Sequence, residues 1–350
     1  MTSARMVVIL PCIRNLLLKL VGAPSKSQVN MRNHAFEVKK KVCMRKRLLW
    51  PYAMPILHGE DDMALILDPK HHDAGVRLFG RHYDISSRRQ PGLELLRQIL
   101  SGFSHLPYEN LSKIIKFHRY GENEEQRLRL PEEVMEDHLR LRLGGTCFSL
   151  TFCLQSILMH YGFPAYVVMG DMKTGRNIHC AIVVMLDDVK YLVDPGYLLR
   201  QPMALDPNQP RLYHTEFAGV ELRFDWQTET HEVFTFNRQE MKWRYRFADR
   251  PAPPDEFLQH WQASFHRNSM NGLCLTCAAE NELIFIHKDF MRLTTLDGKR
   301  NVPIKRSYHA TIQQLFGIAP EYVEQALSAL RENLAREKVG QTASSVKNQI

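Results

Sequence analysis

Three residues of the chain have the types and the order that nucleophilic chemistry requires. Cys147 follows a Gly-Gly-Thr turn and opens a predicted helix, His179 lies near the start of a predicted strand, and Asp194 ends the next strand. At a helix N-terminus a thiolate is stabilised by the positive end of the helix dipole and by free backbone N–H groups. This order favours an activated cysteine nucleophile.

The relation between the histidine and the aspartate depends on the register of one predicted hairpin. A two-residue turn at 187–188 places Asp194 opposite Ala181, on the same sheet face as His179 and diagonal to it. A three-residue turn would move Asp194 to the other face. In the first register Asp194 accepts from one imidazole nitrogen, and the other nitrogen can take the proton of Cys147, which is a Cys-His-Asp triad.

Each of the three residues also has an ordinary structural explanation, namely packing, surface exposure or a turn. Their joint order and phase favour catalysis over those explanations. Cys153 falls about 240° around the helix from Cys147 and is interpreted as core, and Cys180 points to the sheet face opposite His179. Cys274 and Cys277 form one C-x-x-C pair, but zinc usually needs four ligands, so we expect no metal.

The elements that must hold these residues change type along the chain. Helical periodicity extends to about Pro164, with helices predicted over 93–103, 131–142 and 147–161, and strands follow from Tyr166. We predict an α+β protein with these parts: a basic N-terminal extension, 1–73; a helical bundle with the cysteine, 74–164; a β-barrel with the histidine and aspartate, 165–255; an α/β lid, 256–338; and a polar tail, 339–350. The last helix is predicted over 321–336.

The charge of +8 is confined to one end of the 350-residue chain. Residues 1–50 carry a net charge of +10 and the remaining residues −2, so we expect no nucleic-acid binding by the folded body. The basic segment is interpreted as a solvated extension, with membrane contact as the alternative. Apolar residues between Ile13 and Val21 share a helical face, which also fits an organellar presequence.

Seven scattered cysteines do not suggest a disulfide framework, and reducing conditions fit them better. No run reaches the roughly 18 apolar residues of a membrane span. We therefore predict a cytoplasmic protein, with an organellar location as the alternative.

Four segments resemble the arylamine N-acetyltransferase family, over residues 75–335. They are His105-Leu106-Pro107-Tyr108-Glu109-Asn110-Leu111, Gly144-Gly145-Thr146-Cys147-Phe148, the pair of Ile178-His179 with Leu192-Val193-Asp194-Pro195-Gly196, and Leu315-Phe316-Gly317-Ile318. The resemblance implies a helical bundle, a central antiparallel β-barrel and an α/β lid, the cysteine-triad fold also used by transglutaminase-like and papain-like enzymes. It implies acetyl-CoA as donor and an arylamine or hydrazine as acceptor; no CoA-binding residue can be assigned.

The chain departs from the family pattern beside the cysteine. The arginine expected four residues before Cys147 is Leu143, and the family's polar residues two and four positions after it are Ser149 and Thr151. In the family that arginine pairs with the glutamate that corresponds to Glu109. We predict that Arg142 takes its place, with Arg140 as the second candidate.

The predicted activity is transfer of an acetyl group from acetyl-CoA, through a thioester on Cys147, to the nitrogen of a small amine. Two alternatives stay open at this point. The same triad serves amide hydrolases and amide synthases, which differ in whether water or an amine attacks the acyl-enzyme. A third hypothesis is a catalytically inactive relative that acts as a binding protein.

Overall fold

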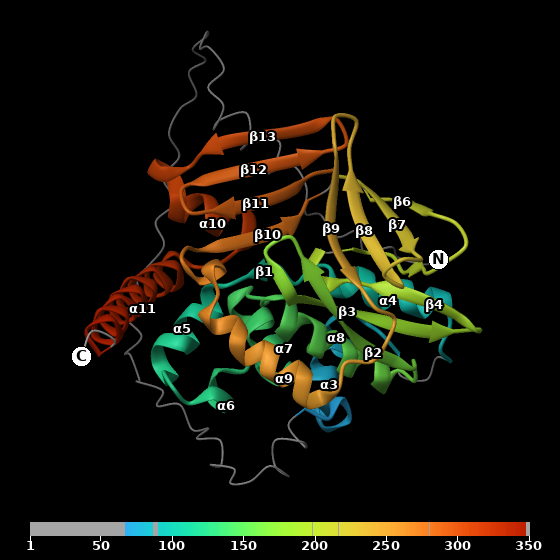
Figure 1. The fold of residues 1–350 in the computed structure, drawn as a ribbon, viewed down its shortest axis with the longest axis horizontal. Coiled ribbons are helices and arrows are strands. Elements are labelled where there is room, and N and C mark those ends of the chain that lie inside the picture. The colour runs from blue at the N-terminus through green and yellow to red at the C-terminus, as the bar shows by residue number, and fades with distance from the viewer. Residues whose placement is uncertain (1–66, 87–89, 198, 216, 280, 348–350) are drawn as a thin grey trace, which may run out of the picture. The chain divides into compact units, whose positions relative to one another are not determined.

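The structure is a computed structural model that describes residues 67–347 except 87–89, 198, 216 and 280 (Figure 1). The predicted presequence-like helix and the basic run of residues 1–50 lie outside these residues. The following paragraphs concern the described part alone.

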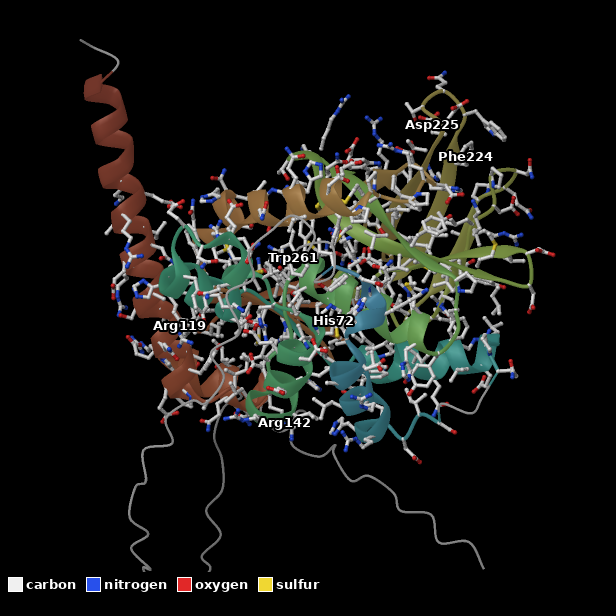
Figure 2. The ribbon with its side chains drawn as sticks, turned by 90° about the horizontal axis from the view of Figure 1, so that it is seen from below. His72, Arg119, Arg142, Phe224, Asp225 and Trp261 are labelled. Atoms are coloured by element: carbon white, nitrogen blue, oxygen red, sulfur yellow. The ribbon has the colours of Figure 1, made fainter. Side chains whose placement is uncertain are left out.

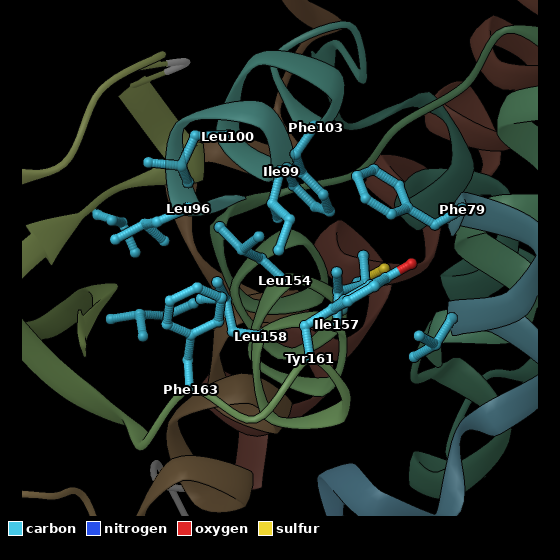
Figure 3. Packing of buried hydrophobic residues seen from close by; sticks show 14 of the residues in the cluster. Phe79, Leu96, Ile99, Leu100, Phe103, Leu154, Ile157, Leu158, Tyr161 and Phe163 are labelled. Atoms are coloured by element: carbon cyan, nitrogen blue, oxygen red, sulfur yellow. The ribbon is translucent and has the colours of Figure 1, made fainter. Parts of the chain in front are cut away.

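Helices form the first part of the described chain. A 3-10 turn (η1, Pro69–His71) precedes α3 (Asp73–His82), α4 (Leu93–Phe103), α5 (Leu111–Tyr120), α6 (Glu124–Arg127), α7 (Pro131–Leu141) and α8 (Cys147–His160). Apolar residues occur on every side of α8, which is typical of a helix buried all round. Figure 3 shows Leu154, Ile157 and Leu158 of α8 packed among side chains of α3 and α4.

An antiparallel sheet of eight strands follows, in the order β5-β4-β3-β2-β9-β8-β7-β6. Its strands are β2 (Ala165–Met172), β3 (Gly175–Leu186), β4 (Val189–Val193), β5 (Met203–Ala204), β6 (Arg211–His214), β7 (Gly219–Asp225), β8 (Thr230–Phe236) and β9 (Met241–Phe247). The two edge strands, β5 and β6, approach each other, so the sheet is a nearly closed barrel around Val183, Leu222 and Tyr245. Figure 2 shows Phe224 and Asp225 at the tip of the β7–β8 hairpin.

A second sheet joins the helical part of the chain to its C-terminal part. Its order is β1 (Tyr108–Glu109), β10 (Cys274–Ala278), β11 (Leu283–His287), β12 (Phe290–Thr295) and β13 (Gly298–Pro303). Helix α9 (Pro254–Ala263) precedes it, and α10 (Tyr308–Phe316) and α11 (Pro320–Lys347) follow it. Helix α11 packs against α5 (Figure 1). The predicted α+β fold of helices, barrel and a final sheet with helices is confirmed.

The hairpin register predicted for β3 and β4 is also confirmed. Ile182 pairs with Val193 and Leu186 with Val189, which leaves a two-residue turn. Asp187 and Asp188 both have positive φ, at 49° and 60°, as a two-residue hairpin turn of type I′ requires.

Three features differ from the sequence-based prediction. The short strands β1, β5 and β6 were not predicted, because two to four residues carry too little period-two signal. Helix α11 continues to Lys347 instead of ending at Arg336, since residues 337–347 hold no proline and one glycine, which costs only about 1 kcal/mol. Leu67 and His72, assigned to the extension, are buried.

Candidate active site

The turn before α8 places Cys147 by a close approach of two backbone segments. A Cβ atom on Gly144 would lie 1.9 Å from the carbonyl oxygen of Pro107, and one on Gly145 would lie 2.3 Å from Oγ of Ser149. Backbone hydrogen bonds join the same segments, because Glu109 N–H donates to the Gly145 carbonyl at 2.9 Å. Only glycine fits at 144, where the neighbouring atoms are backbone, so this contact fixes where α8 begins.

His179 and Asp194 form the pair that the register predicts. Nε2 of His179 and Oδ2 of Asp194 are 2.8 Å apart, and both side chains are buried. Tyr245 donates its hydroxyl to the same carboxylate oxygen at 2.6 Å, while Gly196 N–H donates to Oδ1 at 2.9 Å. These bonds leave Nδ1 of His179 as the imidazole nitrogen that does not face the aspartate.

Gly196 marks the point where the three predicted residues meet. A Cβ atom on Gly196 would lie 2.9 Å from Cε1 of His179, 3.2 Å from Oδ1 of Asp194 and 3.5 Å from Cβ of Cys147. The structure therefore brings Cys147, His179 and Asp194 together around one backbone position. Pairing of β3 with β4 ends at Ile182–Val193, short of this point.

The charges of the site favour an ion pair between the thiol and the imidazole. The adjacent Cys180 thiol, the His179 imidazolium and the Lys113 ammonium hold the pKa of Cys147 well below its usual range, against the effect of burial. Burial alone would lower the pKa of His179, but Asp194 and Cys147 raise it to about 10. At neutral pH the favoured state is thiolate and imidazolium, which is the reactive form of a cysteine nucleophile.

Lys113 is a buried cation that sequence reasoning missed. Its ammonium donates to the backbone carbonyl of Ser264 at 3.0 Å and lies 4.5 Å from the ring centre of Phe265. Burial lowers the pKa of Lys113 to about 7. The sequence shows only a lysine among apolar residues. The groups that surround its ammonium come from a segment about 150 residues further along the chain, so no local pattern indicates them.

The partner of Glu109 is Arg129, and the prediction of Arg142 is wrong. One guanidinium nitrogen of Arg129 lies 3.2 Å from Oε1 of Glu109 and donates to the Gly144 carbonyl at 2.7 Å. The other terminal nitrogen donates to Asp137 at 2.8 Å. Glu109 is fully buried and Arg129 nearly so. Arg129 therefore ties the first β-strand to the nucleophile turn.

Arg142 has a different position because it ends α7. It takes a left-handed conformation, φ 62°, which turns its side chain out to solvent, where it packs against the Gly317 turn (Figure 2). Arg140 is exposed as well. Leu143, at the family's arginine position, is fully buried.

The two polar departures after the cysteine serve local structure. Ser149 donates to the Thr146 carbonyl at 3.1 Å, within the first turn of α8. Thr151 donates to the Cys180 carbonyl at 3.3 Å and so ties α8 to β3. Neither hydroxyl contacts His179 or Asp194 through a hydrogen bond in the described part.

Asn110 links the nucleophile region to the second sheet. Its amide nitrogen donates to the carbonyls of Ser269 and Gly272 at 3.0 and 2.9 Å, and its oxygen accepts from Cys274 N–H at 2.8 Å. The segment that contains Pro107, Glu109 and Asn110 thus contacts both the turn before Cys147 and the entry to β10.

The C-x-x-C pair lies on β10, in the second sheet. Cys274 and Cys277 are an odd number of residues apart on one strand, so their side chains point to opposite faces. Within residues 67–347, as described, no cluster of three or more His, Cys, Asp or Glu could hold a metal ion. The helices described there also include none long and apolar enough to cross a membrane.

This geometry defines a class of α+β proteins, in which a helix presents a cysteine to a histidine–aspartate pair on a barrel. A profile of the family described as N-acetyltransferase matches residues 92–323. Because that match covers more than half of the chain, the protein belongs to the arylamine N-acetyltransferase family. No curated protein sequence matches the chain.

Solved structures share the fold at low sequence identity. The arylamine N-acetyltransferase of Mycobacterium abscessus matches with a TM-score of 0.65 and 17% identity, over 79% of this chain and 99% of its own. Arylamine N-acetyltransferase C of Bacillus anthracis gives 0.56 and 20%, over 70% and 98%. A Bacillus cereus arylamine N-acetyltransferase, described as having a Cys-His-Glu catalytic triad, gives 0.56 and 17%, over 70% and 98%.

Proposed function

We propose that the protein transfers an acetyl group from acetyl-CoA to the nitrogen of an arylamine or hydrazine, through a thioester on Cys147. Membership of the family supports acetyl-CoA as the donor. The observation that carries the proposal is the meeting of Cys147, His179 and Asp194 around Gly196. The carboxylate at the third position has a parallel in the Bacillus cereus protein, whose structure is described as having a glutamate in its triad.

In the first step the Cys147 thiolate attacks the thioester carbonyl carbon of acetyl-CoA. A carbon–sulfur bond to Cys147 forms, the bond to the CoA sulfur breaks, and the CoA thiolate leaves with the proton carried by His179. Asp194 holds the imidazole in place and favours its charged form. The result is acetyl-Cys147, free CoA and a neutral His179.

In the second step a neutral amine attacks the acetyl carbon. His179 takes a proton from the attacking nitrogen, the bond to Cys147 breaks, and the thiolate and imidazolium return. The amide leaves as product. An amine, rather than water, is the expected acceptor of the proposed reaction.

Backbone N–H groups of the first turn of α8 are the expected oxyanion donors. No side chain of the described residues caps this end of α8, so its N–H groups stay available beside Cys147. One such donor contributes roughly 2.7–4 kcal/mol of transition-state stabilisation in acyl transfer.

The parts of the chain take separate roles in this proposal. Residues 74–164 supply the nucleophile, residues 165–255 supply His179 and Asp194, and residues 256–338 act as a lid over the helical part. The contacts of Asn110 with the entry to β10 support a mechanical link between the first and third of these parts. Residues 1–73 and 339–350 supply no group to the reaction.

The decisive experiment is intact-protein mass spectrometry after incubation with acetyl-CoA. We expect one added acetyl group on the wild-type protein, its absence in Cys147→Ala, and its presence in Cys153→Ala, a matched control on the same helix. Addition of an aromatic amine should remove the label and yield the amide. Loss of the acetyl group in buffer without amine, at the same rate as with amine, would support a hydrolase. No acetylation at all would support an inactive binding protein.

A further inference from the structure

We propose that Cys147 and Cys180 form an oxidative modification site, at which a hydroperoxide converts the two thiols into a reversible intramolecular disulfide. The expected loss of activity rests on the proposed function. The disulfide itself does not, because it can be measured directly on the protein.

The first turn of α8 lies on β3 at Cys180. Thr151 donates its hydroxyl to the Cys180 carbonyl at 3.3 Å, and Cys147 precedes Thr151 by four residues. Residues four apart share a helix face, so Cys147 faces the same stretch of β3. This hydrogen bond keeps the two cysteine-bearing segments close, as a disulfide requires.

The side chain of Cys180 points toward α8. It belongs to a buried cluster with Phe148 and Phe152 of that helix, and Cys147 packs against the same cluster. His179, the next residue on β3, points to the opposite face and binds Asp194. Cys147 therefore lies between its general base on one side and a second thiol on the other.

The two thiols differ in access and in acidity, which sets the order of the steps. Cys147 is partly exposed, whereas Cys180 is fully buried. The neighbouring thiol and imidazole lower the pKa of Cys147, and burial raises that of Cys180. An oxidant thus reaches Cys147 first and meets it as a thiolate, the form that reacts.

The chemistry balances with a hydroperoxide as the two-electron oxidant. The Cys147 thiolate attacks the peroxide, the O–O bond breaks, and Cys147 becomes a sulfenic acid. The alkoxide or hydroxide that leaves takes the proton of the His179 imidazolium and departs as an alcohol or water. Cys180 sulfur then attacks the sulfenic sulfur, its thiol proton joins the departing hydroxide, and water leaves. A dithiol reductant reverses the disulfide by exchange.

The other cysteines of the described part are placed differently. Cys153 lies six residues further along α8, in the core cluster between the helices. Cys274 and Cys277 lie on β10 and point to opposite faces. We therefore expect the cross-link to be specific for Cys147 and Cys180.

The test is peptide mapping of the full-length protein under non-reducing conditions after treatment with hydrogen peroxide. We expect one cross-linked species that joins the Cys147 and Cys180 peptides and weighs two hydrogens less than their sum. Acetylation of Cys147 should fall by roughly tenfold or more and return after dithiothreitol, because disulfides are reversible and higher sulfur oxides are not.

Two variants separate the proposal from simple oxidation of the nucleophile. Cys180→Ala should go on to sulfinic acid and stay inactive after dithiothreitol, while Cys153→Ala should behave as the wild type. Oxidised Cys147 without a link to Cys180 would overturn the proposal, as would full recovery of Cys180→Ala. If Cys180→Ala fails to fold, the peptide map of the wild-type protein tests the proposal by itself. That map does not depend on whether the protein transfers an acetyl group.

Discussion

At the scale of single residues, the arrangement of the triad requires a glycine at position 196. A methyl group at this position would lie within 3.5 Å of all three members of the triad, and only 2.9 Å from Cε1 of His179. Real Cβ contacts are never that short, so the imidazole would have to move.

We expect Gly196→Ala to slow alkylation of Cys147 by roughly tenfold or more, since small displacements of reacting groups cost this much. The melting temperature should change little, and iodoacetamide kinetics would measure the effect. Gly92→Ala is a matched control, because a Cβ atom there meets only the Gln90 carbonyl oxygen, at 3.9 Å. Equal rates in Gly196→Ala and wild type would contradict the assembled triad.

Asp194 is expected to act through His179 rather than on the substrate. Asp194→Asn keeps the size of the side chain but loses the charge that holds the imidazole in its charged form. We expect the fold to survive and acetyl transfer to fall on the order of 10³–10⁴-fold. Steady-state kinetics with a matched thermal melt would check this, and full activity would remove Asp194 from the mechanism.

The shifted pKa of His179 predicts a pH dependence of stability. Its pKa is about 10 in the folded protein and about 6.5 in an unfolded chain. Because folding raises this pKa, the protonated imidazole of His179 stabilises the folded state. That contribution is complete below pH 6.5 and disappears as the pH rises through 10.

The stability gap between wild type and His179→Gln should therefore narrow between pH 7 and pH 10.5. Thermal melts at several pH values would measure it. In the same variant we expect Cys147 to alkylate more slowly, because the imidazole that helps to lower its pKa is absent. A gap that stays constant with pH would mean that the imidazole is neutral in the folded protein.

At the scale of elements, Arg129 holds the nucleophile turn. It reaches this position from the loop between α6 and α7, and it replaces the missing family arginine by approaching Glu109 from another part of the chain. Breaking a buried pair of this kind leaves a charge without its partner.

We expect Arg129→Leu to lower the free energy of unfolding by about 3–5 kcal/mol and to slow alkylation of Cys147. Arg142→Leu should have little effect on either quantity, because Arg142 is exposed. Urea denaturation of both variants provides the comparison. A larger loss in Arg142→Leu would reverse this assignment.

At the scale of the whole molecule, the folded part begins before the boundary that the sequence suggested. Leu67 packs in the cluster that contacts Cys147. The ring of His72, labelled in Figure 2, lies 5.2 Å from that of Phe152, and its Nδ1 lies 2.8 Å from the Glu132 carboxylate. A chain that starts near Ala74, the predicted start of the helical bundle, lacks these contacts.

We expect a chain that begins at Gly59 to keep the stability and acetyl transfer of the full protein. One that begins at Ala74 should melt at a lower temperature, because burying a leucine side chain alone contributes about 1.5–3 kcal/mol. Differential scanning calorimetry and the acetylation assay would compare the two. Identical melts would show that Leu67 and His72 are dispensable.

The sequence by itself determined the features that depend on local spacing. A two-residue turn and strict alternation set the β3–β4 register, and with it the pairing of His179 and Asp194. A glycine pair before an apolar helix marked Cys147. Such signals can be read because they lie within a few residues of one another.

Only the tertiary structure decided the contacts that cross large distances in the chain. The sequence favoured Arg142 as the partner of Glu109 because it neighbours the family position, but a left-handed helix end turns it outward and Arg129 arrives from the preceding loop. The same holds for Cys180, Lys113 and Gly196 around Cys147. Which of several cations or thiols reaches a buried group depends on how the elements pack, and no local pattern records that.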